Sequence, residues 1–116
     1  MKVLIGEARP SLDAYTLQGL MAAGHDVRRS HIGAELLFQL QQGSYDVVIL
    51  GEEARDQMGI ERIRTAGMRT PVLLLEDSEM MDVSLLGEHT ECLVKPFSLS
   101  RLLACMNRLA DKKLAY

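Results

Sequence analysis

The stretch Tyr45-Asp46-Val47-Val48-Ile49-Leu50-Gly51 decides the fold of this chain. Its four central residues are apolar without interruption and three are β-branched, which is typical of a strand covered on both faces. Comparable runs lie at residues 3–5, 72–75 and 93–94, with a weaker one around Val27. Each pair of neighbouring runs is far enough apart to leave room for one helix. The pattern therefore predicts five strands of a parallel sheet.

Segments with a helical spacing of apolar residues separate these runs. Small polar residues precede some of them and glycines follow others, as is usual at helix ends. The predicted helices are residues 12–23 between Pro10-Ser11 as the N-cap region and Gly24, 34–42 before Gly43, 60–66 before Gly67, 80–86, and 99–113 with Ser98 as the N-cap. Alternating strands and helices predict a doubly wound α/β fold with helices on both faces of the sheet.

Composition excludes several classes of protein. The chain has 116 residues, of which 47% are hydrophobic and 25% charged, and this predicts one globular domain over residues 1–116. Thirteen Lys and Arg against sixteen Asp and Glu give a formal charge of −3, so direct contact with nucleic acid is not expected. Without a signal peptide or a long apolar run, we expect a cytoplasmic protein with no membrane contact. Cys92 and Cys105 are expected to be free thiols.

In an open parallel sheet the ligand site lies beyond the carboxyl ends of the strands. The residues to consider are therefore those that follow each apolar run. They are Glu7-Ala8-Arg9, Gly51-Glu52-Glu53, Glu76-Asp77 and Lys95-Pro96-Phe97.

These stretches resemble the receiver domain of bacterial two-component response regulators, from Met1 to about Leu109. The likeness rests on Met1-Lys2-Val3-Leu4-Ile5 with Glu7 and Pro10, Ala22-Ala23-Gly24-His25, Tyr45-Asp46-Val47-Val48-Ile49-Leu50, Gly59, Thr70-Pro71-Val72 and Lys95-Pro96-Phe97. The winged-helix OmpR/PhoB-like subfamily is the most similar in appearance. The resemblance implies a flavodoxin-like (βα)5 fold with strand order 2-1-3-4-5 and a cis peptide between Lys95 and Pro96.

The resemblance also implies a phosphorylation pocket whose side chains have changed. In the family, an aspartate after the third strand accepts a phosphoryl group, and acids after the first strand hold Mg²⁺. A hydroxyl and a lysine after the last two strands contact the phosphoryl oxygens. Gly51 occupies the acceptor position, and Glu7 and Ala8 occupy the positions of the metal-binding acids. Glu76 stands at the position of the hydroxyl, and Lys95 stands at the position of the lysine. Glycine has no nucleophile and one carboxylate holds Mg²⁺ poorly, so we expect a pseudo-receiver that is not an enzyme and has no metal or other cofactor.

Two alternatives stay open at this pocket. A displaced acid, such as Glu52 or Glu53, would be the acceptor if the chain were phosphorylated after all. Lys95 is expected to form an ion pair with Glu7 or Glu76 because a partly buried cation needs a partner. The alternative is that Lys95 holds a small external anion, which would make the chain an anion sensor.

Receivers signal through the face made by the fourth helix, fifth strand and fifth helix. Cys92 occupies the position of the movable aromatic residue of the family, and we take it as the switch position. The connection from Glu76 to Lys95 is short, which predicts a short or irregular fourth helix. The candidate interface residues are Met80, Met81, Leu85, Leu86, Glu91 and Cys105.

We expect phosphorylation-independent binding of a protein partner or a second copy at this face. Two settings stay open: the amino-terminal part of a transcription regulator with a DNA-binding output domain, and a free-standing adaptor. A redox switch through the two cysteines is a further alternative.

Overall fold

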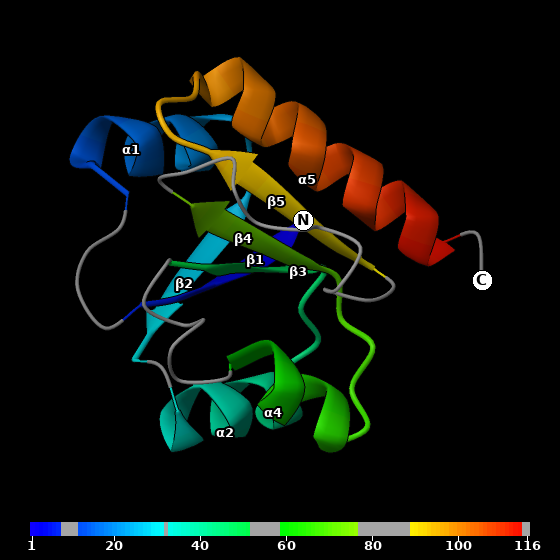
Figure 1. Cartoon of the computed structure of the whole chain (residues 1–116). Helices are drawn as coiled ribbons and strands as arrows, with labels where there is room; N and C mark the ends of the chain where they lie inside the picture. Colours follow the sequence, from blue (N-terminus) through cyan, green and yellow to red (C-terminus); the bar gives the residue numbers. More distant parts are fainter. Residues whose placement is uncertain (8–11, 32, 52–58, 77–88, 115–116) are drawn as a thin grey trace.

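A five-stranded, all-parallel sheet forms the centre of the computed structural model, which describes residues 1–7, 12–31, 33–51, 59–76 and 89–114 (Figure 1). The strands are β1 (Lys2–Gly6), β2 (Asp26–Ser30), β3 (Val47–Leu50), β4 (Val72–Glu76) and β5 (Thr90–Val94). The helices are α1 (Ala14–Ala22), α2 (Ala34–Gln42), α4 (Gly59–Thr65) and α5 (Leu99–Leu114). The strand order is β2-β1-β3-β4-β5, which confirms the predicted topology.

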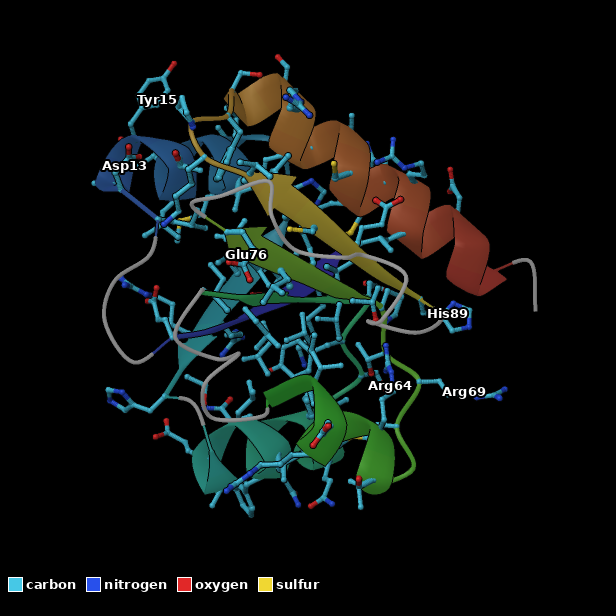
Figure 2. All side chains as sticks on the ribbon, in the orientation of Figure 1. Asp13, Tyr15, Arg64, Arg69, Glu76 and His89 are labelled. Atoms are coloured by element: carbon cyan, nitrogen blue, oxygen red, sulfur yellow. The ribbon has the colours of Figure 1, made fainter. Side chains whose placement is uncertain are left out.

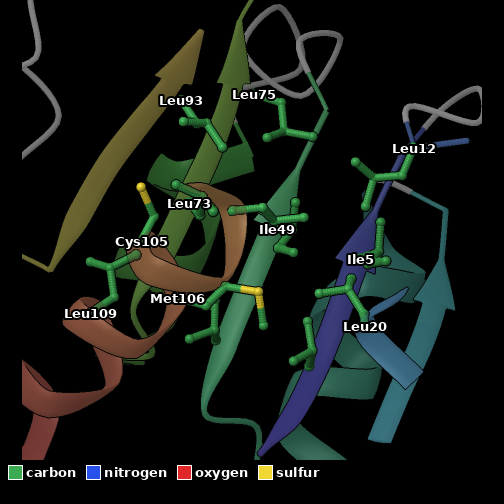
Figure 3. Close-up of a cluster of buried hydrophobic side chains, with 13 residues drawn as sticks. Ile5, Leu12, Leu20, Ile49, Leu73, Leu75, Leu93, Cys105, Met106 and Leu109 are labelled. Carbon is green, nitrogen blue, oxygen red and sulfur yellow. The ribbon is translucent and has the colours of Figure 1, made fainter. Parts of the chain in front are cut away.

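The sheet separates two hydrophobic clusters. Helices α1 and α5 cover one face, and α2 and α4 cover the other (Figure 1). Alternate residues of β3 enter different clusters: Val47 and Ile49 pack with α1 and α5, whereas Val48 and Leu50 pack with α2 and α4. Figure 3 shows the first cluster, in which Met106 and Leu109 of α5 lie against the strands. Burial on both faces explains why the run at β3 is apolar without interruption.

The start of α1 differs from the prediction. Its N-cap is Asp13, not the Pro10-Ser11 stretch, because the Oδ1 atom of Asp13 accepts a hydrogen bond from the Thr16 amide at 2.7 Å. This bond to the backbone lowers the pKa of the Asp13 carboxyl. Leu12 is buried in the cluster beneath α1 and α5, so the chain turns into the helix one residue after that contact. The predicted end is confirmed, since Gly24 follows the helix with a φ of +93°.

The remaining described elements match their predicted positions closely. The second helix has the predicted bounds, and α4 begins and ends one residue earlier than predicted. The Lys95–Pro96 peptide is cis, as expected. The helix predicted over residues 80–86 lies outside the described residues. None of the described helices has both the length and the apolar character needed to span a membrane.

The N-cap of α5 is Ser98, as predicted. Its Oγ atom accepts a hydrogen bond from the Arg101 amide at 3.1 Å. We expect Ser98→Ala to lower the free energy of unfolding by about 1 kcal/mol in a urea titration, because a helix amide loses its acceptor. Ser100 is an exposed residue of the same helix and supplies the control. Ser100→Ala should leave the stability unchanged or raise it slightly, since alanine favours helices. Equal losses in the two variants would contradict the capping role.

Candidate functional site

Four of the five predicted pocket positions meet at the carboxyl edge of the sheet. Glu7 follows β1, Gly51 follows β3, Glu76 ends β4 (Figure 2), and Lys95 follows β5. Backbone hydrogen bonds hold neighbouring positions together: the Gly51 amide donates to the Gly6 carbonyl at 3.1 Å, and the Lys95 amide donates to the Glu76 carbonyl at 2.8 Å. The fifth position, Ala8, lies outside the described residues.

Both carboxylates of this edge are buried. Glu7 and Glu76 are each only 6% exposed, whereas Lys95 is half-buried. A carboxylate withdrawn from water to this extent requires hydrogen-bonding or cationic partners within the protein. The ion pair predicted between Lys95 and one of these two carboxylates stays a prediction.

The structure adds a cation to this edge that the sequence analysis did not include. The guanidinium of Arg29, on β2, binds one oxygen of Glu7, with Nε at 2.9 Å and Nη2 at 2.5 Å from Oε1. Parallel pairing of β1 with β2 places Arg29 beside Ile5, and the Glu7 amide donates to the Ser30 carbonyl at 3.1 Å. Strand pairing therefore brings the guanidinium to the buried acid.

With Arg29 included, the formal charges of the four charged side chains that the structure describes at these strand ends cancel. Glu7 and Glu76 contribute two negative charges, and Arg29 and Lys95 contribute two positive ones. The sequence signal for Arg29 was weak because β2 is an outer strand, and only one of its five residues, Ser30, is buried. A charge at that position looks like an ordinary surface residue until the strand pairing is known.

The described residues do not fit the Mg²⁺ ion that the receiver resemblance implies. They contain no group of three or more His, Cys, Asp or Glu side chains that could hold a metal ion. Mg²⁺ in a phosphoryl-transfer site has octahedral geometry and is held by one or two carboxylates together with waters and phosphate oxygens. The one acid after β1 within the described residues is Glu7, and its Oε1 atom already accepts two bonds from a guanidinium.

The predicted readout face is described at β5 and α5. Glu91 of β5 and Arg108 of α5 form a bidentate pair, with Nε to Oε1 and Nη2 to Oε2 both at 2.9 Å. This pair raises the pKa of the Arg108 guanidinium. Glu91 is one of the predicted interface residues, but nothing in the sequence pattern indicated Arg108 as its partner. The apolar candidates Met80, Met81, Leu85 and Leu86 lie outside the described residues.

The two cysteines occupy different surroundings, and both are free thiols. Cys105 is 8% exposed and packs in the cluster that contains Leu93 (Figure 3). Cys92 is half-buried and immediately precedes Leu93 in β5, so its side chain leaves the opposite face of the strand. The sheet therefore separates the two thiols, and the structure offers no support for a disulfide switch between them. Burial also leaves Cys105 little surface to offer a partner.

No protein-family model and no curated protein matches the sequence. Solved structures do resemble the chain. The receiver domain of the Francisella response regulator 1452 has a TM-score of 0.79 at 23% sequence identity, and the match covers 97% of this chain and 98% of that one. The chemotaxis response regulator CheY4 of Vibrio cholerae has a TM-score of 0.74 at 26% identity, with 93% and 97% covered.

A third similar structure belongs to a longer protein. NtrX from Brucella abortus, solved in complex with ADP, has a TM-score of 0.80 at 16% identity. The match covers 98% of this chain but 27% of that one. Together with the strand order, these matches confirm the resemblance predicted from the sequence.

Proposed function

The chain is a response-regulator receiver domain by fold, and from this premise we propose that it signals without being phosphorylated. Its output is binding of a protein partner or of a second copy through the face of β5 and α5. We propose that this activity takes place in the cytoplasm and serves transcriptional regulation. In this proposal, residues 1–116 are the amino-terminal domain of a longer regulator. The match to part of NtrX is consistent with such an arrangement.

The observation that supports this proposal most strongly is the residue at the carboxyl end of β3. Gly51 is buried there, at the position where the resemblance places the acceptor aspartate. An acyl phosphate needs a carboxylate nucleophile, and glycine provides none. The pairing of Glu7 with Arg29 adds to this argument, because it engages the carboxylate that would otherwise contact Mg²⁺.

The direct test is exposure to a small phosphoryl donor. We expect the purified chain to show no mass gain in intact-mass spectrometry after incubation with acetyl phosphate and Mg²⁺. We also expect beryllofluoride with Mg²⁺ to cause no chemical-shift change at residues 51, 76 and 95. A receiver that retains its acceptor aspartate, treated in parallel, shows that the reagents are active.

A gain of one phosphoryl group would contradict the proposal. Peptide mapping would then locate the acceptor, and modification of Glu52, Glu53 or another displaced acid would support the alternative function. Sedimentation at several protein concentrations separates the two proposed settings, because a dimer supports the transcription regulator and a strict monomer supports the adaptor.

A further inference from the structure

We propose that the guanidinium of Arg29 takes the place of a divalent cation at Glu7, so that this edge of the sheet carries its own fixed positive charge and excludes Mg²⁺. This inference rests on the proposed function. A receiver that signals without phosphoryl transfer does not need an exchangeable cation at this position.

The geometry of the pair supports this substitution. Two nitrogens of Arg29 converge on one oxygen of Glu7, at 2.9 and 2.5 Å. The acid is buried, whereas the Arg29 side chain is about half exposed and reaches the acid from the neighbouring strand. Hydrogen bonds between a guanidinium and a carboxylate are short and strong because both groups are charged. The cation is thus held by the protein itself.

The chemistry of the two cations differs in a way that matters for a switch. A guanidinium stays protonated throughout the pH range in which proteins are folded, so its charge does not depend on the solution. A bound metal ion, in contrast, exchanges with the solvent and depends on the metal concentration. A second cation at Glu7 would meet the like charge of Arg29 at close range. The pair therefore makes the edge independent of divalent metal.

The neighbouring arginine on the same strand provides a matched control. Arg28 pairs with Asp26 at 3.1 Å, and both side chains are more than half exposed. Arg28 carries the same charge as Arg29 and lies on the same strand, but its partner is the exposed Asp26 and not the buried Glu7. Replacing each arginine in turn separates the loss of a cation at the buried acid from the loss of positive charge in general.

The test compares the full chain with Arg29→Ser, Arg28→Ser and the double variant Arg29→Ser/Glu7→Gln. Thermal unfolding is followed with millimolar MgCl₂ or with KCl at equal ionic strength. We expect Mg²⁺ to leave the midpoint of the wild type and of Arg28→Ser unchanged. It should raise the midpoint of Arg29→Ser by only about 2 °C, because the single freed carboxylate binds Mg²⁺ weakly and a ligand of the native state alone stabilises that state. The double variant should show no such rise.

Line broadening by Mn²⁺ in amide NMR spectra gives a second readout. We expect broadening at residues 5–7 and 51 in Arg29→Ser and none there in the wild type. A wild type that responds to Mg²⁺ or Mn²⁺ at these residues overturns the inference, and so does an Arg29→Ser chain that responds to neither ion. If Arg29→Ser does not fold, Arg29→Gln is used in its place with the same two criteria.

The outcomes also distinguish this inference from the proposed function. A wild type that binds Mg²⁺ but gains no mass from acetyl phosphate overturns the role of Arg29 alone. A wild type that excludes Mg²⁺ but becomes phosphorylated overturns the proposed function and leaves the cation replacement standing.

Discussion

We expect the single variant Gly51→Asp to gain no phosphoryl group from acetyl phosphate, and the fourfold variant Gly51→Asp/Ala8→Asp/Glu76→Thr/Arg29→Ser to gain one on most molecules. Phosphoryl transfer depends almost entirely on positioning and on neutralising charge, so a nucleophile alone is not sufficient. The single variant keeps Glu76 where phosphoryl oxygens would lie and lacks a second carboxylate for Mg²⁺. Intact-mass spectrometry over a time course measures the difference.

Each added change in the fourfold variant corrects one of these obstacles. Ala8→Asp supplies a second acid beside Glu7, and Glu76→Thr replaces a negative charge with a hydroxyl. Arg29→Ser frees the oxygen of Glu7 that now accepts two hydrogen bonds from the guanidinium. The same fourfold chain with Gly51→Asn in place of Gly51→Asp is the control, and it should not be labelled. Efficient labelling of Gly51→Asp alone would show that phosphoryl transfer depends less on the metal site than expected.

Arg64→Ala is expected to lower the free energy of unfolding by about 2–3 kcal/mol. The Nη1 atom of Arg64 donates to the carbonyls of Met68 and Thr70 at 3.0 and 2.8 Å, and Nη2 lies 3.4 Å from the His89 carbonyl. Arg64 thus links the end of α4 to the segment before β4 and to the start of β5 (Figure 2). Hydrogen bonds from a charged donor contribute more than neutral ones, and their loss leaves partly buried carbonyls without this donor.

Urea unfolding of Arg64→Ala and of Arg62→Ala measures this contribution. Arg62 is exposed on the same helix, so its removal should change the stability by less than about 0.5 kcal/mol. Arg64→Lys should recover little of the loss, because an ammonium cannot present the planar fork of donors. Burial lowers the pKa of the Arg64 guanidinium, and the nearby charge of Arg69 lowers it further to a smaller extent. Equal losses in the two alanine variants would contradict the linking role.

The sheet could be predicted from sequence because its inner strands are buried on both faces. The runs at β1, β3 and β4 consist of apolar residues, and their parallel order follows from the helices between them. The same reasoning placed Glu7, Gly51, Glu76 and Lys95 at one edge, since the carboxyl ends of parallel strands meet there. This part of the site is a consequence of topology and needs no knowledge of side-chain contacts.

The contacts that depend on pairing between distant segments could not be predicted in the same way. Arg29 meets Glu7 only because β2 pairs with β1 in a particular register, and an exposed outer strand has little apolar pattern to reveal that register. Arg64 binds carbonyls on two different segments, which no spacing in the sequence indicates. The choice of Asp13 as N-cap depends on where Leu12 enters the core.

The position of β2 at the border of the sheet has a consequence for the behaviour of the chain at high concentration. An outer strand exposes backbone groups that a strand from another molecule can pair with, and such pairing is a route to aggregation and fibrils. Three of the five residues of β2 are charged: Asp26, Arg28 and Arg29. An incoming strand would have to desolvate these groups, so the same guanidinium that neutralises a buried acid also helps to keep the border of an aliphatic sheet from polymerising.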